Sequence, residues 1–149
     1  MALPLRVVCT VALLARANAF GHFIGCSEKC YFKGDGTPLS FWDAHSYCED
    51  NGGSLALVTS EAENEAAYSA CTDGGTTYPQ CWIGLAQSTD DLSWTWVNGV
   101  SLEWSNWDEG EGTSGDENFA FYTHDNGATW HDVNENGDGE TIALCSRCC

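Results

Sequence analysis

The chain has 149 residues, with 22 acidic side chains against five Lys and Arg, and a formal net charge of −17. Its length is that of one domain with a sizeable core. Nucleic acid and anionic lipid head groups are bound through clusters of Lys and Arg, which this chain lacks. The charge therefore argues against both partners and favours cations as small partners.

The first 19 residues have the pattern of a secretory signal peptide. Arg6 precedes an apolar run over residues 7–14, and a small-residue Ala-Asn-Ala pattern ends at Ala19. The run is far shorter than the roughly 20 residues that span a bilayer, and no later segment could span one. We expect cleavage after Ala19 and a secreted, extracellular protein in which residues 20–149 form one domain. Because the removed segment holds two of the five basic residues and no acidic one, the net charge would become −19.

Nine cysteines occur, and Cys9 lies in the expected signal peptide. The remaining eight are an even number, which in an exported protein predicts up to four disulfides. Cys71 and Cys81 are close enough in sequence to bridge locally. Zinc is disfavoured, because Cys26 and Cys30 have no CxxC or paired His partner downstream.

Two segments carry helix signatures. Ser40 followed by Asp43 indicates the start of a first helix, which ends before the Asn-Gly-Gly run at residues 51–53. Ser60 followed by Glu63 indicates a second helix that continues to Cys71. Apolar residues recur at helical spacing in the first, and the second is rich in alanine.

The rest of the chain has strand patterns. We expect strands at residues 26–31, 55–58, 81–85, 94–96, 119–122, 129–133 and 141–145, with hairpin turns at Asn98-Gly99 and Asn126-Gly127. Two helices followed by a series of strands predict an α+β domain rather than alternating βαβ units.

Residues 104–132 combine oxygen-bearing side chains, glycines and tryptophans more densely than any other stretch. The oxygen ligands that Ca²⁺ prefers are supplied by Glu111, Asp116, Glu117, Asn118 and Asp132. Interleaved tryptophans distinguish the stretch from a solvated acidic loop, which is usually poor in aromatic residues. We therefore expect a calcium-binding loop that is anchored to the core.

A second acidic segment follows at residues 132–140. Its oxygen-bearing residues alternate as in a calcium loop. An EF-hand would need Glu at the twelfth position, where Ala143 stands, and flanking helices where strands are expected. The favoured interpretation is an acidic turn with Asn136-Gly137 at its tip.

Together these residues resemble the C-type lectin-like domain family. The resemblance covers about residues 26–147 and rests on segments in the family's order: Phe41-Trp42-Asp43-Ala44, Cys48, Gly53-Ser54-Leu55-Ala56, Glu61, Trp82-Ile83-Gly84-Leu85, Trp104-Ser105-Asn106-Trp107, Gly110-Glu111, Trp130-His131-Asp132-Val133 and Cys145. It implies two helices with antiparallel sheets and a long calcium-binding loop region. It also implies a bridge from Cys48 to Cys145, and it is consistent with Cys26 and Cys30 meeting Cys148 and Cys149 in either pairing.

The family's sugar site uses Glu-Pro-Asn or Gln-Pro-Asp, then a Glu, then Trp-Asn-Asp. In this chain Gly112 stands at the proline position, and restoring proline there together with asparagine at 113 and 131 is expected to strengthen calcium and sugar binding. The resemblance implies that calcium ligands come from Glu111, Thr113, Glu117, Asn118, His131 and Asp132. It implies sugar contacts from Glu111, Thr113, Glu117 and His131, with Trp107 or Trp130 packing on the sugar ring.

Two functions follow from this resemblance. One is calcium-dependent carbohydrate binding through residues 104–132, with a glycan or glycoprotein as partner. The other is binding of a protein or another surface without sugar, with calcium structural or absent. An enzyme is not expected, because no nucleophile and base accompany paired carboxylates such as Glu109 and Glu111.

Overall fold

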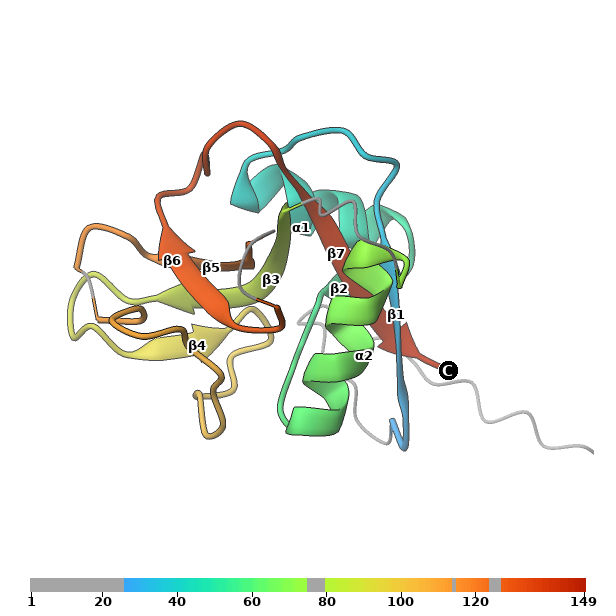
Figure 1. The fold of residues 1–149 in the computed structure, drawn as a ribbon, viewed down its shortest axis with the longest axis horizontal. Helices are drawn as coiled ribbons and strands as arrows, with labels where there is room; N and C mark the ends of the chain where they lie inside the picture. Colours follow the sequence, from blue (N-terminus) through green and yellow to red (C-terminus); the bar gives the residue numbers. More distant parts are fainter. Residues whose placement is uncertain (1–25, 75–79, 114, 124–126) are drawn as a thin grey trace, which may run out of the picture.

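A computed structural model describes residues 26–74, 80–113, 115–123 and 127–149. Within them two helices and seven strands alternate in the order β1, α1, β2, α2 and then β3 to β7 (Figure 1). The elements are β1 (Lys29–Lys33), α1 (Phe41–Asp50), β2 (Ser54–Leu55), α2 (Glu61–Thr72), β3 (Gln80–Gln87), β4 (Trp94–Trp96), β5 (Phe119–Tyr122), β6 (Trp130–Val133) and β7 (Thr141–Cys148). The predicted α+β class is confirmed.

Both helices begin at the expected serines. The Ser40 hydroxyl accepts the N–H of Asp43 at 3.2 Å, and the Ser60 hydroxyl accepts that of Glu63 at 3.3 Å. Each bond satisfies one of the donors that a helix start leaves unpaired. The second cap is not reciprocal, since the Glu63 carboxylate accepts the N–H of Thr59 instead of that of Ser60.

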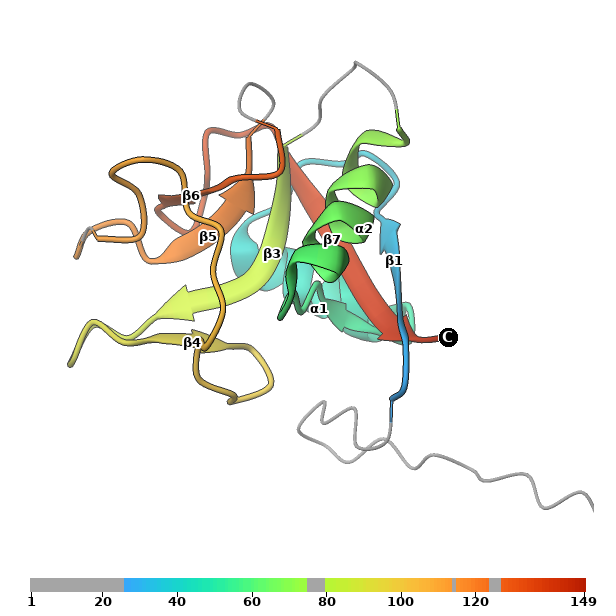
Figure 2. The same cartoon turned by 60° about the horizontal axis from the view of Figure 1, so that its bottom comes forward.

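Strand β7 lies at the centre of the fold. The sheet order is β1-β7-β3-β5-β6, with β2 pairing with β7 and β4 pairing with β3. β3 and β7 run parallel, and the other paired strands are antiparallel. Figure 2 shows β4, β5 and β6 as a separate lobe on the far side of β3 from α2 and β1. This lobe carries the long loop of residues 97–118.

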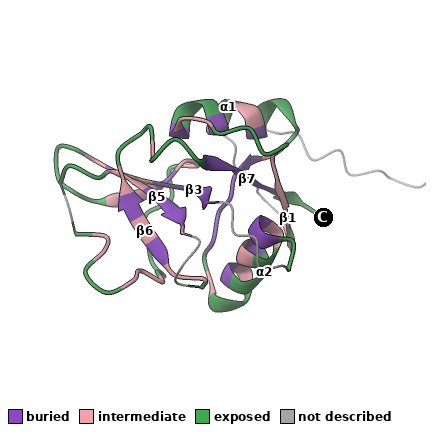
Figure 3. Ribbon diagram, turned by 45° about the horizontal axis from the view of Figure 1, so that its top comes forward, coloured by how far each residue is buried: buried purple, intermediate pink, exposed green. Residues whose placement is uncertain are grey.

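The two helices cover different sides of the sheet (Figure 3). Successive side chains of β3 point to opposite faces of the sheet. Ile83 and Leu85 therefore belong to one core cluster, and Trp82 belongs to the other. The cluster on the α1 side also contains Phe41 and Ala44, and the opposite cluster contains Trp130. β3 is therefore the element that connects the helical frame to the loop lobe.

Four disulfides link the frame. Cys48–Cys145 ties α1 to β7 across 97 residues, and Cys71–Cys81 ties the end of α2 to β3, the two pairs expected from the sequence. The two remaining bridges are Cys26–Cys148 and Cys30–Cys149. They hold β1 against the end of β7, where Lys29 is in register with Cys148.

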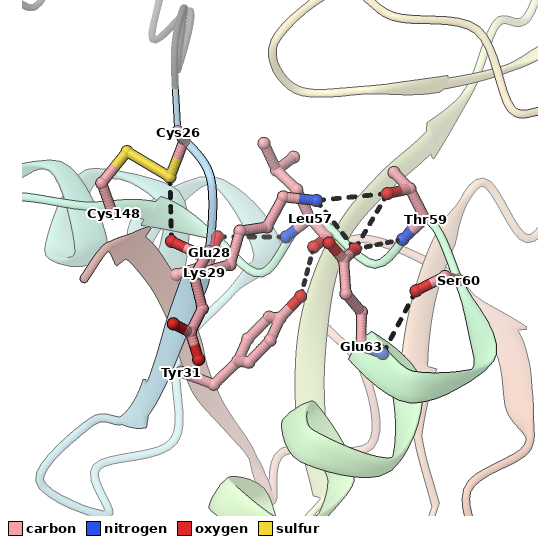
Figure 4. Close-up of polar contacts among 10 residues, drawn as sticks. Cys26, Glu28, Lys29, Tyr31, Leu57, Thr59, Ser60, Glu63 and Cys148 are labelled. Atoms are coloured by element: carbon pink, nitrogen blue, oxygen red, sulfur yellow. Dashed lines mark hydrogen bonds and ion pairs between the residues drawn. A yellow bond between two sulfur atoms is a disulfide. The ribbon is translucent and has the colours of Figure 1, made fainter.

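A polar network joins α2 to β1 (Figure 4). The ammonium group of Lys29 lies 2.8 Å from Glu63, whose Oε2 also accepts the N–H and the hydroxyl of Thr59. Tyr31 donates its hydroxyl proton to the Leu57 carbonyl at 2.7 Å. Burial alone would raise the pKa of Glu63, but the donors from Lys29 and Thr59 hold it below its ordinary value.

Two expected strands have other bounds, and one expected turn lies outside the described residues. The first strand runs over Lys29–Lys33 rather than residues 26–31, because its pairing with β7 begins at Lys29. The second covers only Ser54–Leu55 rather than residues 55–58, because only these two residues pair with β7. The turn at Asn98-Gly99 is present, with the Gly99 N–H bonded to the Trp96 carbonyl. Asn126 of the other expected turn lies outside the described residues.

Candidate functional site

The long loop is anchored to the core through its tryptophans, as expected. The backbone of residues 106–108 runs beside β6, with the Trp130 N–H bonded to the Asn106 carbonyl and the Asp108 N–H bonded to the Trp130 carbonyl. The Trp107 ring packs against Trp94 at 4.7 Å and against the edge of Trp130 at 5.6 Å. These contacts hold the acidic part of the loop next to β6.

A buried amide on α2 holds the base of this arrangement. The Asn64 Oδ1 atom accepts the Tyr122 hydroxyl at 2.6 Å and the Trp130 indole N–H at 2.8 Å. Its Nδ2 donates to the Ala128 carbonyl. The side chain therefore connects α2, β5 and β6. The sequence analysis did not identify Asn64. The one indication in the sequence is that this polar residue lies on the otherwise apolar face of an amphipathic helix.

Two of the predicted ligands, Glu111 and Asp132, face each other. Asp132 is 6% exposed, and its Oδ1 accepts the N–H of Gly112 at 2.9 Å. The Glu111 carboxylate accepts the Asp132 N–H at 3.3 Å. Burial and the neighbouring Asp132 carboxylate raise the pKa of Glu111. Two carboxylates held this close repel each other when both are ionised, and a cation between them would relieve that repulsion.

His131 lies at the edge of the pair. Its Nε2 is 3.1 Å from the Asp108 carboxylate, and its Nδ1 is 3.7 Å from that of Glu111. When protonated, the ring would offset part of the negative charge around Glu111. His131 thus contacts the site through two carboxylates, and its nitrogens suit a hard cation poorly.

Unpartnered oxygens point to a wider ligand set. Within the described residues, the buried atoms without a hydrogen-bond partner include Asp132 Oδ2, Asn118 Oδ1 and Gln87 Oε1. Gln87 follows Ile83 and Leu85 on one face of β3, and its N–H bonds the Asn118 carbonyl at 2.8 Å. Alternation places Gln87 and Asp132 on the face of the sheet that carries the loop. Neutral amide oxygens beside carboxylates suit Ca²⁺.

Gln87 was missed by the sequence analysis, although strand alternation could have found it. The buried strand pattern was expected to stop at Leu85, two residues earlier on the same face. Asn118, which was predicted, immediately precedes β5 and lies beside Gln87.

The remaining predicted ligands are more exposed. Glu117 lies on the exposed part of the loop before β5, and the Thr113 hydroxyl donates to the Gly110 carbonyl in its own turn at 3.2 Å. No group of three or more His, Cys, Asp or Glu side chains in the described part of the chain could hold a metal ion. The structure therefore brings Glu111 and Asp132 together and leaves Glu117 apart from them.

The expected benefit of proline at position 112 is wrong. Gly112 has φ +75°, whereas proline is confined to a φ of about −65°. An added Cβ would lie 2.6 Å from the Trp107 ring, and proline would also remove the N–H that Asp132 accepts. The glycine is required by this backbone, which Trp107 covers and whose carbonyl accepts the Trp94 indole N–H.

The expectation that Trp130 packs on a sugar ring is also wrong. Its side chain is 0% exposed, and three other tryptophans, Trp96, Trp104 and Trp107, pack against it edge-on. Trp107 is only half-buried and remains able to contact a ligand.

The segment after β6 forms a turn, as favoured by the sequence analysis. The Gly137 N–H bonds the Asn134 carbonyl at 3.0 Å, and Gly137 itself has φ +58°. Asp138 accepts the Glu140 N–H and the Gln80 side-chain amide, which ties the turn to the start of β3. Its carboxylate is engaged in holding the turn.

The fold and this site together define a lectin-like binding domain: two helices on a disulfide-linked sheet, with a long loop that presents carboxylate and amide oxygens. Comparison with known proteins supports this class. A family model described as the lectin C-type domain matches residues 37–147. The chain therefore belongs to the C-type lectin domain family, whose members are carbohydrate-binding and non-enzymatic.

Individual relatives match the chain at moderate identity and over only part of its length. The chain is 33% identical to rat (Rattus norvegicus) lithostathine over 85 residues, 56% of this chain and 51% of that protein. The crystal structure of human lithostathine has a TM-score of 0.70 at 25% identity, covering 81% and 84% of the two chains. A cow C-type carbohydrate-recognition domain of CD23, solved in the presence of an oligosaccharide, has a TM-score of 0.63 at 25% identity, covering 81% and 88%. The chain thus spans about half of the lithostathine it matches, and much less of some larger relatives.

Within the described residues, no helix has the length and apolar character needed to cross a bilayer.

Proposed function

We propose that this domain binds carbohydrate in a calcium-dependent manner through the region of residues 104–132, which includes part of the long loop, β5 and most of β6. The observation that carries the proposal is the pair of facing carboxylates, Glu111 and Asp132, one of which has a buried oxygen without a partner. Such a pair is unfavourable by itself and becomes favourable around a cation.

The residues that would hold the ion are Glu111 and Asp132, with the amide oxygens of Asn118 and Gln87, and with Glu117 if the exposed loop moves inward. All are hard oxygen donors, as Ca²⁺ requires. The bound ion would supply open coordination positions for a pair of sugar hydroxyls. The half-buried Trp107 would offer an apolar surface beside them.

We further propose that residues 1–19 are a signal peptide and that the protein is secreted, with residues 20–149 as its domain. Four disulfides support this, since such bonds persist in oxidising compartments. The partner would then be an extracellular glycan or glycoprotein.

A second function is favoured by His131. Its ring lies within ion-pair distance of Asp108 and Glu111, and its nitrogens suit a hard cation poorly, so these contacts can hold the loop without a metal. A domain stabilised in this way would bind a protein or another surface without sugar.

A glycan array probed with and without a calcium chelator tests the first function against the second. We expect retention of a set of glycans in calcium, release in chelator, and loss of retention in Asp132→Asn. Retention by no glycan in calcium would contradict the proposal and favour the second function. Asp138→Asn is the matched control, because that carboxylate belongs to the neighbouring turn.

A further inference from the structure

A groove on the α1 side of the sheet has neither Glu111 nor Asp132 among its lining residues. Its volume is about 520 Å³, and its walls come from α1, the β3–β4 hairpin and the start of β5. Lining residues include Trp42, His45, Ala86, Thr95, Val97 and Phe119, together with Gln87 and Asn118, which are also candidate calcium ligands. Ala86 and Phe119 are paired in register and are each adjacent in sequence to a residue on the loop face. The groove and the candidate calcium site therefore meet at Gln87 and Asn118, whereas the carboxylates of Glu111 and Asp132 belong to the calcium site alone.

One wall of the groove is an aromatic cluster. Trp42 is 50% exposed, although large apolar side chains are usually covered. Its ring is held edge-on against Phe119 at 5.9 Å and against His45 at 6.3 Å. The indole is thus fixed by neighbouring rings while half of its surface stays open to solvent. A fixed and open indole is a surface on which a flat apolar face can pack at little entropic cost.

The opposite wall carries hydroxyl groups. Ser88, Thr89 and Thr95 line the groove, and no Asp, Glu, Lys or Arg is among the lining residues that the structure describes. In a chain with a net charge of −17 this makes the groove an uncharged surface. The occupant that it fits is therefore uncharged as well, because a buried ion would need a charged partner.

His45 contributes a further polar group. Its buried Nδ1 has no hydrogen-bond partner among the described residues, while its Nε2 lies 3.6 Å from a Glu49 carboxylate oxygen. With the proton on Nε2, facing that carboxylate, Nδ1 is an acceptor.

We propose that this groove is a second, calcium-independent binding site for an uncharged saccharide ring. A pyranose has a C–H face that packs on an indole and equatorial hydroxyls that both donate and accept, which match Trp42 on one wall and Thr95 and its neighbours on the other. The volume lies within the roughly 300–1,000 Å³ of small-ligand sites. The site is independent of Glu111 and Asp132, so it can exist whether or not the loop binds calcium.

The test is an NMR titration of the ¹⁵N-labelled protein in EDTA with methyl β-D-glucopyranoside, methyl α-D-mannopyranoside, N-acetylglucosamine and lactose. We expect at least one of these to shift the Trp42 indole resonance, which Trp42→Phe identifies by its loss. Trp42→Ala should weaken binding by about tenfold or more. Trp42→Phe should weaken it by about threefold or less, and the titration of this variant is followed on the backbone resonance of Thr95. Thr95→Val removes a hydroxyl while keeping the side-chain shape and should weaken binding by roughly threefold or more.

Two control variants should leave this titration unchanged. Val100→Ala shortens an exposed apolar side chain outside the groove. Asp132→Asn disables the calcium site. Shifts that require calcium and disappear in Asp132→Asn would overturn the inference while supporting the proposed function. No shift with any of the four saccharides, or unaltered binding in Trp42→Ala, would overturn the inference and leave the proposed function to its own test.

Discussion

The helical frame and the loop lobe of this domain are stabilised in different ways. The frame, formed by α1, α2, β1, β2 and β7, is tied by disulfides and capped helices. The three basic residues that follow residue 19 are Lys29, Lys33 and Arg147, all on β1 or β7. Residues 82–140 contain no cysteine and no Lys or Arg, but thirteen carboxylates occur there. The lobe depends on tryptophan packing and a few buried polar groups.

This difference separates stability from binding. The frame can hold the domain together whatever the lobe binds, because its bridges and caps do not involve the loop. The lobe has negative charges that no nearby Lys or Arg neutralises. Repulsion between these charges lowers the stability of the lobe, and a bound cation would reduce the repulsion. Changes in the frame should therefore alter folding, whereas changes in the acidic loop should alter ligand response.

The largest expected effect is on the frame. Replacing Cys48 and Cys145 together by serine opens a loop of 97 residues. In the chain-entropy model this costs roughly 4–5 kcal/mol of unfolding free energy. Urea unfolding followed by circular dichroism measures it. A loss below about 1 kcal/mol would mean that the frame does not depend on its covalent link.

The next effect is at the base of the lobe. Asn64→Ala leaves the buried Tyr122 hydroxyl and Trp130 indole N–H without their acceptor, at an expected cost of about 2–4 kcal/mol. The near-ultraviolet circular dichroism of the tryptophans should change with it. Asn98→Ala, in a surface turn, is the matched control and should cost less than about 1 kcal/mol. Equal losses in the two variants would show that Asn64 does not position β6.

A smaller effect is expected where α2 meets β1. Glu63→Gln weakens the contacts with Lys29 and Thr59 and should cost about 1–2 kcal/mol at pH 7. The pKa of Glu63 is lower in the folded chain, so its contribution is complete above the unfolded value, near pH 4.5, and is lost as the pH falls through the folded value. The difference between wild type and variant should shrink in acid. A pH-independent difference would contradict the ion pair.

The smallest effect has the opposite sign. The pKa of Glu111 is raised on folding, so the folded chain binds this proton more tightly than the unfolded chain does. Its contribution to stability therefore falls as the pH rises from below the ordinary value, near 4.5, to above the folded value. In chelator at pH 7, Glu111→Gln should stabilise the protein by a few tenths of a kcal/mol, up to about 1. Thermal melts at pH 4 and pH 7 check this, and a destabilised variant at pH 7 would show that Glu111 is held by favourable contacts.

Local chemistry made the frame predictable from the sequence. Ser40 and Ser60 mark their helices because a hydroxyl at that position accepts an unpaired N–H whatever surrounds it. Cys48 and Cys145 were assigned through the family resemblance, and they bridge as expected. Such features depend on neighbours in sequence or on a family order, both of which can be read directly.

The site was predictable only in part, because its residues meet through tertiary packing. Glu111 and Asp132 were found, but Gln87 lies on a strand distant in sequence, and its role depends on the register of β3 with β5. Trp130 was expected to help anchor the loop but was also offered, beside Trp107, as a surface for a sugar ring, since the sequence gives no indication that Asn64 binds its indole N–H in the core. Gly112 was taken as a loss of proline, although its positive φ is what the loop requires.

Calcium-dependent stability of the intact protein tests the central claim most directly. Extracellular modules of this kind hold calcium with dissociation constants of about 10⁻⁴–10⁻³ M, so a few millimolar Ca²⁺ should add about 1–2 kcal/mol, or roughly 2–6 °C in Tm. Differential scanning calorimetry in calcium, in magnesium and in chelator would measure this. The account predicts a rise specific to calcium that Asp132→Asn abolishes and that Asp138→Asn and Glu140→Gln retain. An equal rise in magnesium, or no rise at all, would contradict the assignment of a calcium site to Glu111 and Asp132.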